Sequence, residues 1–131
     1  MRALQPILIE VSAGELLDRL TILRIKASRI ADPSKLVNIQ ADLDAITAAV
    51  ARDLPRTPEL FALIADLRLV NEALWDVEDE LRLLERRQDF GPRFIELARA
   101  VYQTNDRRAA LKRDVDDRLG SRRVEEKSYT A

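Results

Sequence analysis

A polar patch midway along two long predicted helices holds the residue types best suited to chemistry. Arginine guanidinium groups bind carboxylate or phosphate through paired hydrogen bonds, and an indole ring supplies a flat apolar wall. If the last two helices fold back on each other, these side chains face one another across the hairpin. We therefore identify a candidate pocket for a small anion, lined by Arg24, Asn71, Trp75, Glu78, Tyr102, Asn105 and Arg108.

The same residues also fit a purely structural network. In that interpretation Glu78 pairs with an arginine and the amides fix the register of the helices, while Trp75 is part of the core. Polar groups at helix contacts serve register more often than catalysis, so this interpretation is favoured. We accordingly predict no catalytic residue.

Carboxylates form a second constellation. Glu15 and Asp18 lie one turn apart, and Asp76, Asp79 and Glu80 crowd the longest predicted helix, so oxygen ligands for Mg²⁺ could converge. Such spacings are more typical of a solvated face, here balanced by Arg19 four residues after Glu15 and Arg82 four after Glu78. The sequence therefore predicts no metal site and no cofactor.

The composition excludes several functional classes. The 131 residues include no cysteine and no histidine, which removes disulfides, thiolate nucleophiles, imidazole bases and the usual zinc or haem ligands. Basic and acidic residues number 22 and 23, so no net field attracts nucleic acid. The apolar run at residues 6–9 is too short for a signal peptide or a membrane span. We expect a cytoplasmic protein without membrane insertion.

These candidate residues must be positioned by helices. A stretch from Leu63 to Leu84 repeats apolar residues at steps of four and three, namely Leu63, Leu67, Val70, Leu74, Val77, Leu81 and Leu84. Helix-start signals at Ser12, Asp32-Pro33 and Thr57-Pro58, and a break at residues 89–92, divide the chain into four helices ending near residues 31, 54, 87 and 120. The expected fold is all-α, a four-helix up-down bundle of two antiparallel hairpins within a single domain, residues 1–131.

The two ends of the chain differ from the helical part. Residues 1–11 form an extended N-terminal segment, because Ile7, Ile9 and Val11 lie on one side of an extended chain. Residues 121–131 form a polar C-terminal tail, which is either disordered or paired, through residues 124–129, with residues 7–11. The longer second hairpin would leave Leu81 and Leu84 uncovered, which predicts a homodimer.

The chain resembles a family of small, uncharacterised, all-helical bacterial proteins. The stretches that carry the resemblance are IEVSAGELLDRLTILRIK at residues 9–26, VNEALWDVEDE at 70–80, DFGPRFIELARAVYQTNDRRAALK at 89–112 and VEEKSY at 124–129. The resemblance implies no known activity. It suggests an accessory role beside glycosyltransferases in the synthesis of envelope polysaccharide.

Two enzyme families offer looser comparisons. The helical chorismate mutases hold two carboxylates with basic side chains beside a glutamate or glutamine, for which Arg24, Arg108 and Glu78 are the analogues. The helix order and a pocket lysine do not match. The all-helical nucleoside triphosphate pyrophosphohydrolases bind Mg²⁺ through paired acidic motifs, of which this chain has only a partial pattern.

From these observations we expect a non-catalytic helical module that binds a protein partner or assembles with itself. The absence of a nucleophile and base pair, a metal set or a phosphate-binding loop supports this expectation. The alternative is a small-anion enzyme or binding protein that uses the polar patch.

Overall fold

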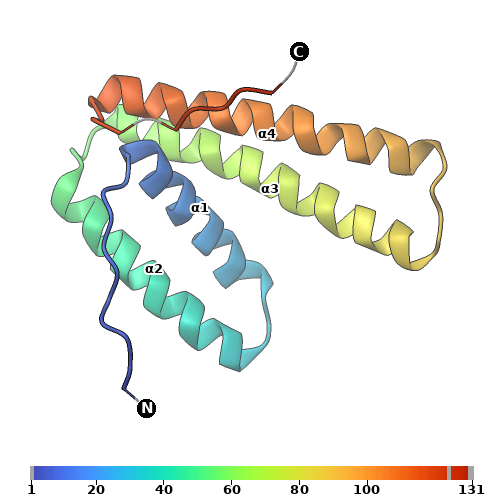
Figure 1. The fold of residues 1–131 in the computed structure, drawn as a ribbon, viewed down its shortest axis with the longest axis horizontal. Coiled ribbons are helices and arrows are strands. Elements are labelled where there is room, and N and C mark those ends of the chain that lie inside the picture. Colours follow the sequence, from blue (N-terminus) through green and yellow to red (C-terminus); the bar gives the residue numbers. More distant parts are fainter. Residues whose placement is uncertain (1, 124, 130–131) are drawn as a thin grey trace.

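The chain folds into four α-helices (Figure 1). A computed structural model describes residues 2–123 and 125–129. The helices are α1 (Ala13–Arg29), α2 (Pro33–Asp53), α3 (Pro58–Arg86) and α4 (Pro92–Leu119). The predicted all-α fold, a four-helix bundle of two antiparallel hairpins, is confirmed.

Each helix begins and ends where the predicted signals lie. The Ser12 side chain accepts a hydrogen bond from the Glu15 backbone N–H at 3.1 Å, and Thr57 does the same for the Leu60 N–H at 3.1 Å. Proline stands in the first turn of α2, α3 and α4. Gly120 ends α4 with a φ of +70°, the left-handed conformation that glycine adopts without strain. Local sequence therefore sets the helix boundaries.

Helix α1 is the central element of the packing. It contacts α2, α3 and α4, whereas α2 packs against α1. The buried core lies between α1, α3 and the end of α4, and consists of Leu17, Leu20, Leu60, Leu63, Ile64, Leu67 and Val115. Partly buried side chains of α2 cover this core from the other side. Helix α1 thus contacts both helices of the second hairpin, and its polar residues Asp18 and Thr21 are buried.

The α3–α4 hairpin extends beyond the end of the first hairpin (Figure 1). The expectation that Leu84 is left uncovered there is wrong, because this side chain is only 8% exposed. Leu97 on α4 is likewise buried, so the two helices of the hairpin bury this end of the seam. The uncovered end of the hairpin is therefore no longer an argument for a homodimer, and the homodimer stays a prediction. None of the described helices is both long and apolar enough to cross a membrane.

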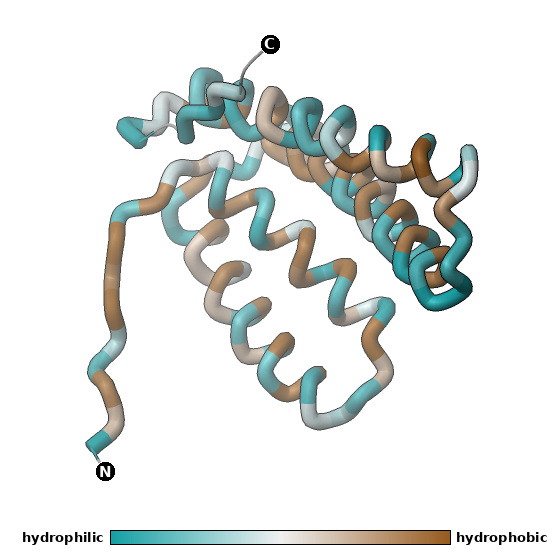
Figure 2. Tube along the Cα trace, turned by 45° about the vertical axis from the view of Figure 1, so that its right-hand side comes forward, coloured by the Kyte–Doolittle hydropathy of each residue, from teal (hydrophilic) through white to brown (hydrophobic). Residues whose placement is uncertain are grey.

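In the described residues, the terminal segments form no two-stranded sheet with each other. No β-strand occurs in the described residues, and Val124 lies outside them. The N-terminal arm, residues 2–11, projects away from the helices (Figure 2). The C-terminal tail, residues 121–123 and 125–129, turns back at Gly120 and runs along α4 (Figure 1). Ion pairs link it to α4, joining Glu125 to Lys112, Glu126 to Arg113 and Lys127 to Asp106. The described part of the tail therefore lies on α4 and not in the strand pairing with residues 7–11 that was the alternative to disorder.

Candidate functional site

A buried polar network lies where α1, α3 and α4 meet. Asp18 on α1 is 1% exposed, and its two carboxylate oxygens accept hydrogen bonds from Nε and Nη2 of Arg108, with 2.9 Å between Nε and Oδ1. Asn71 on α3 donates to Asp18 Oδ1 at 2.9 Å and to the Thr21 hydroxyl at 2.8 Å. The Thr21 hydroxyl in turn donates to the Asp18 carbonyl. One carboxylate therefore ties three helices together.

The two charged groups of the network, Asp18 and Arg108, pair with each other. The hydrogen bonds to Asp18 raise the pKa of Arg108, an effect larger than the opposing cost of its partial burial. In the described part of the chain, every buried side-chain nitrogen or oxygen has a hydrogen-bond partner. A charge left unpaired in such a site would be costly, and here none is. This arrangement stabilises the fold and leaves no buried group waiting for a ligand.

The N-terminus of α1 is closed by residues from the far end of the chain. The Gly14 N–H donates to Asp116 Oδ1 at 2.7 Å, and the Ala13 N–H donates to Ser121 Oγ at 2.9 Å. The first N–H groups of a helix have no partner within it, so these bonds complete α1. Gly14 also permits the close approach, because a Cβ there would lie 2.3 Å from the Lys112 carbonyl oxygen.

A second charged cluster adjoins the first. The Lys112 side chain is 10% exposed, and its ammonium group donates to Glu15 at 2.7 Å and to Glu125. Burial alone raises the pKa of Glu15 and lowers that of Lys112. Burial is the largest single effect on each group, but the ion-pair partners together outweigh it, namely Lys112 and Arg19 for Glu15, and Glu125 and Glu15 for Lys112. The pKa of Glu15 therefore ends below its usual value and that of Lys112 above it.

This pair predicts a stability plateau bounded at both ends of the pH range. Because the folded pKa of Glu15 is lowered, its contribution is present above the unfolded value of 4.5 and is lost as the pH falls through the folded pKa. The contribution of Lys112 is present below 10.5 and is lost as the pH rises through its raised folded pKa. We expect Glu15→Gln to flatten the acid-side loss of stability.

Urea unfolding at a series of pH values measures this effect. Glu126→Gln is the matched control, since that carboxylate is exposed. A Glu15→Gln variant whose unfolding free energy declines in acid as steeply as that of the original chain would contradict the assignment.

Five residues of the predicted polar patch come together in one cleft. This cleft, here called the mid-bundle cleft, has a volume of about 430 Å³ and is also lined by apolar side chains of α1. The predicted residues in it are Asn71, Trp75, Glu78, Asn105 and Arg108. Tyr102 lines a different cavity, between α4 and the C-terminal tail, and Arg24 lines neither of the two. The structure thus brings five of the seven predicted residues together and places Arg24 and Tyr102 outside this cleft.

The pairing of charges agrees with the sequence in one case and differs in another. Glu78 pairs with Arg82 four residues further along the same helix, as their spacing predicts, whereas Arg108 pairs with Asp18. Asp18 was expected on a solvated face but is buried, and Lys112 and Asp116 were not predicted at all. Asp18 follows Leu17 and precedes Thr21 on the face of α1 that the core covers, which is the signal that could have placed it inside. In the described residues, no three carboxylates are grouped so as to hold a metal ion.

Comparison with known protein families gives one match. A family described as being of unknown function, DUF6165, matches residues 7–131. The chain belongs to this family. No curated protein and no solved structure matches the chain. The DUF6165 match includes the apolar part of the arm that begins at Ile7, the buried network and the C-terminal tail.

Proposed function

We propose that this DUF6165 protein is a non-catalytic helical interaction module whose N-terminal arm binds a partner protein. The observation that carries the proposal is the exposure of the arm. Leu4, Ile7, Leu8 and Ile9 are between 77% and 90% exposed, whereas apolar side chains of the helices fill a core. Figure 2 displays this apolar run standing clear of the helices. A contiguous exposed apolar segment is typical of a protein contact.

The backbone of the arm supports one mode of binding. In the described residues, no backbone hydrogen bond involves residues 2–11. The apolar side chains of the arm and its backbone N–H and C=O groups are thus free to pair. Segments that add a strand to the edge of a partner's β-sheet share this property. Pro6 limits the pairing segment to residues 7–11, in which Ile7, Ile9 and Val11 share one side.

The base of the arm is fixed. Glu10 pairs with Arg122 and Arg123 of the tail, and Ser12 then begins α1. Holding one end lowers the entropy lost when the rest becomes ordered on a partner. Two arms pairing with each other would give the predicted homodimer. An isolated two-stranded ribbon is only marginally stable, however, so a partner with a larger sheet is favoured.

Glutamine substitution on one side of the arm provides the test. We expect Ile7→Gln/Ile9→Gln to weaken partner binding at least tenfold, because each buried isoleucine contributes about 1.5–3 kcal/mol. Val37→Gln is the matched control, since Val37 is 70% exposed on α2. A photo-crosslinker at Leu8 identifies the partner, and titration of that purified partner gives the affinities. Sedimentation of the isolated chain tests self-association.

Hydrogen exchange separates the strand-addition mode from other contacts. The amides of residues 7–10 are expected to exchange freely in the isolated chain and to become protected in the complex. The proposal fails if these amides remain unprotected and the double glutamine variant binds as tightly as the original chain.

The mid-bundle cleft is the site of a second candidate function, binding of a small anion. Trp75 and the two amides line it, and Arg29 lies over the Trp75 ring at 5.9 Å. Both Arg108 and Glu78 already have partners within the chain, as described above. An anion would have to compete with Asp18 for Arg108, so we place this function second.

A further inference from the structure

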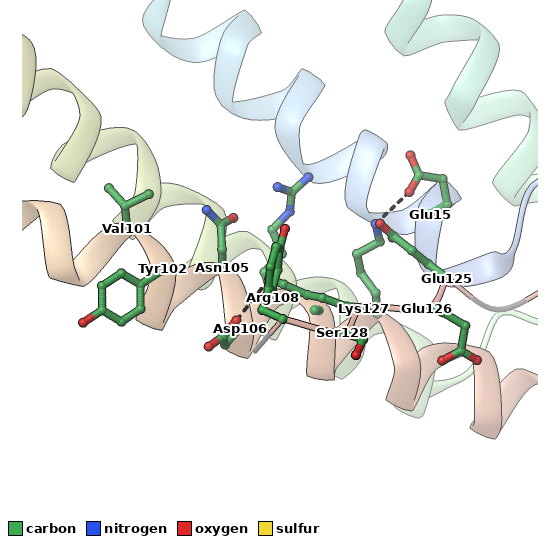
Figure 3. A pocket seen from close by; sticks show the side chains of 13 residues that line it. Glu15, Val101, Tyr102, Asn105, Asp106, Arg108, Glu125, Glu126, Lys127 and Ser128 are labelled. Carbon is green, nitrogen blue, oxygen red and sulfur yellow. Dashed lines mark hydrogen bonds and ion pairs between the residues drawn. The ribbon is translucent and has the colours of Figure 1, made fainter. Parts of the chain in front are cut away.

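Lys112 joins two carboxylates that are attached to the protein in very different ways. Glu15 projects from α1 and is 30% exposed, whereas Glu125 belongs to the non-helical tail and is 62% exposed. Figure 3 shows Glu15 and Glu125 converging, while Glu126 points away. We infer that Lys112 is an oxyanion-binding site that the isolated chain fills with its own Glu125 carboxylate, and that a small carboxylate or phosphate ligand displaces this carboxylate.

Lys112 binds one carboxylate or phosphate group in addition to Glu15. A buried ammonium group requires nearby negative charge. Glu15 supplies part of it but also pairs with Arg19. Other nearby carboxylates have other partners: Asp18 is bound by Arg108, Asp106 pairs with Lys127 and Glu126 pairs with Arg113. Glu125 therefore completes the charge around Lys112, and an external oxyanion that takes its place keeps Lys112 paired.

Glu125 is held weakly enough to be displaced. Its neighbours Glu126 and Lys127 make ion pairs with exposed partners, which contribute little to holding the tail. A group tethered by a short flexible segment competes with an effective concentration in the millimolar range. Ligands at comparable concentrations can therefore replace it.

The space beside Lys112 is large enough for a ligand. A cavity of about 1000 Å³ lies between α4 and the tail, at the upper end of the range for small-molecule sites. Tyr102, Asn105 and Ser128 line it with hydrogen-bonding groups. The ligand class is thus a small acid whose remaining part carries hydroxyl or amide groups. This site is separate from the N-terminal arm, so either proposal can fail alone.

Paired glutamine variants of the full chain test the inference. Inorganic phosphate and citrate are titrated calorimetrically at low salt into the original chain, Glu125→Gln and Glu126→Gln. Both variants lose one negative charge, so any difference between them is local rather than a net-charge effect. We expect Glu125→Gln to bind at least one probe tenfold more tightly than the original chain, and Glu126→Gln to remain within twofold of it.

Lys112→Gln in the Glu125→Gln background is expected to abolish that binding while circular dichroism still reports a helical fold. Equal affinities in the two single glutamine variants, or no measurable binding of either probe to Glu125→Gln, would overturn the inference. If Lys112→Gln does not fold, the comparison of the two single variants decides alone.

Discussion

Asp18→Ala is expected to lower the free energy of unfolding by about 3–5 kcal/mol, the usual cost of breaking a buried ion pair by removing one partner. The Asp18 side chain is 1% exposed, and its loss leaves the Arg108 guanidinium without its acceptor and the Asn71 amide with the Thr21 hydroxyl in place of two acceptors. A single domain has a total stability of about 5–15 kcal/mol, so this change removes a large share.

Glu78→Ala is the control for Asp18→Ala. Glu78 pairs with Arg82 on the surface of α3, where the Arg82 side chain is 67% exposed, and such pairs contribute about 0–1 kcal/mol. Urea titration followed by circular dichroism measures both variants. Similar losses for the two variants would show that the buried network does not have the importance assigned to it.

Gly14→Ala is expected to destabilise the fold by about 2–3 kcal/mol, although alanine is the better helix former. The added Cβ would lie 2.3 Å from the Lys112 carbonyl oxygen and 2.9 Å from Asp116 Oδ1. Backbone atoms cannot turn aside, so α1 and α4 must separate. The Asp116 carboxylate, which is 2% exposed, then loses its hydrogen bond from the Gly14 N–H.

Gly91→Ala is the matched substitution at a helix start. A Cβ there would meet only the flexible Asp89 side chain, at 3.3 Å, so we expect a loss below about 1 kcal/mol. A Gly14→Ala variant as stable as Gly91→Ala would mean that the contact between α1 and α4 adjusts easily.

The helices could be predicted from the sequence because their signals are local. Ser12, Asp32 and Thr57 each accept a hydrogen bond from a backbone N–H two or three residues later. The residues that make these caps are therefore close together in the sequence. The seam from Leu63 to Leu84 is likewise a property of one helix. No knowledge of neighbouring helices is required for such features.

The candidate site could be predicted only in part, because partner choice depends on how the helices cross. The spacing of Glu78 and Arg82 correctly predicted their pair. The pairing of Asp18 with Arg108 spans 90 residues and depends on α1 packing against both α3 and α4. Arg24 and Tyr102 lie outside the mid-bundle cleft for the same reason, since a small rotation of a helix moves a side chain to another face.

The position of the C-terminal tail could not be predicted from the sequence for a different reason. Its polar composition fits disorder, pairing with the arm or docking on α4 equally well. Docking brings together three pairs of charges that come close only after the turn at Gly120.

The bond from Ala13 to Ser121 also bears on how the chain folds during synthesis. The two residues are 108 positions apart, which corresponds to about 5–20 s at ribosomal rates. Until α4 and Ser121 have been made, the N–H groups of Ala13 and Gly14 lack these acceptors, and the apolar face of α1 lacks the α4 residue Val115. The helix that joins the molecule together is therefore the first to be made and the last to be completed. Partly synthesised chains therefore expose the apolar face of α1, where chaperones can bind and where neighbouring nascent chains can aggregate.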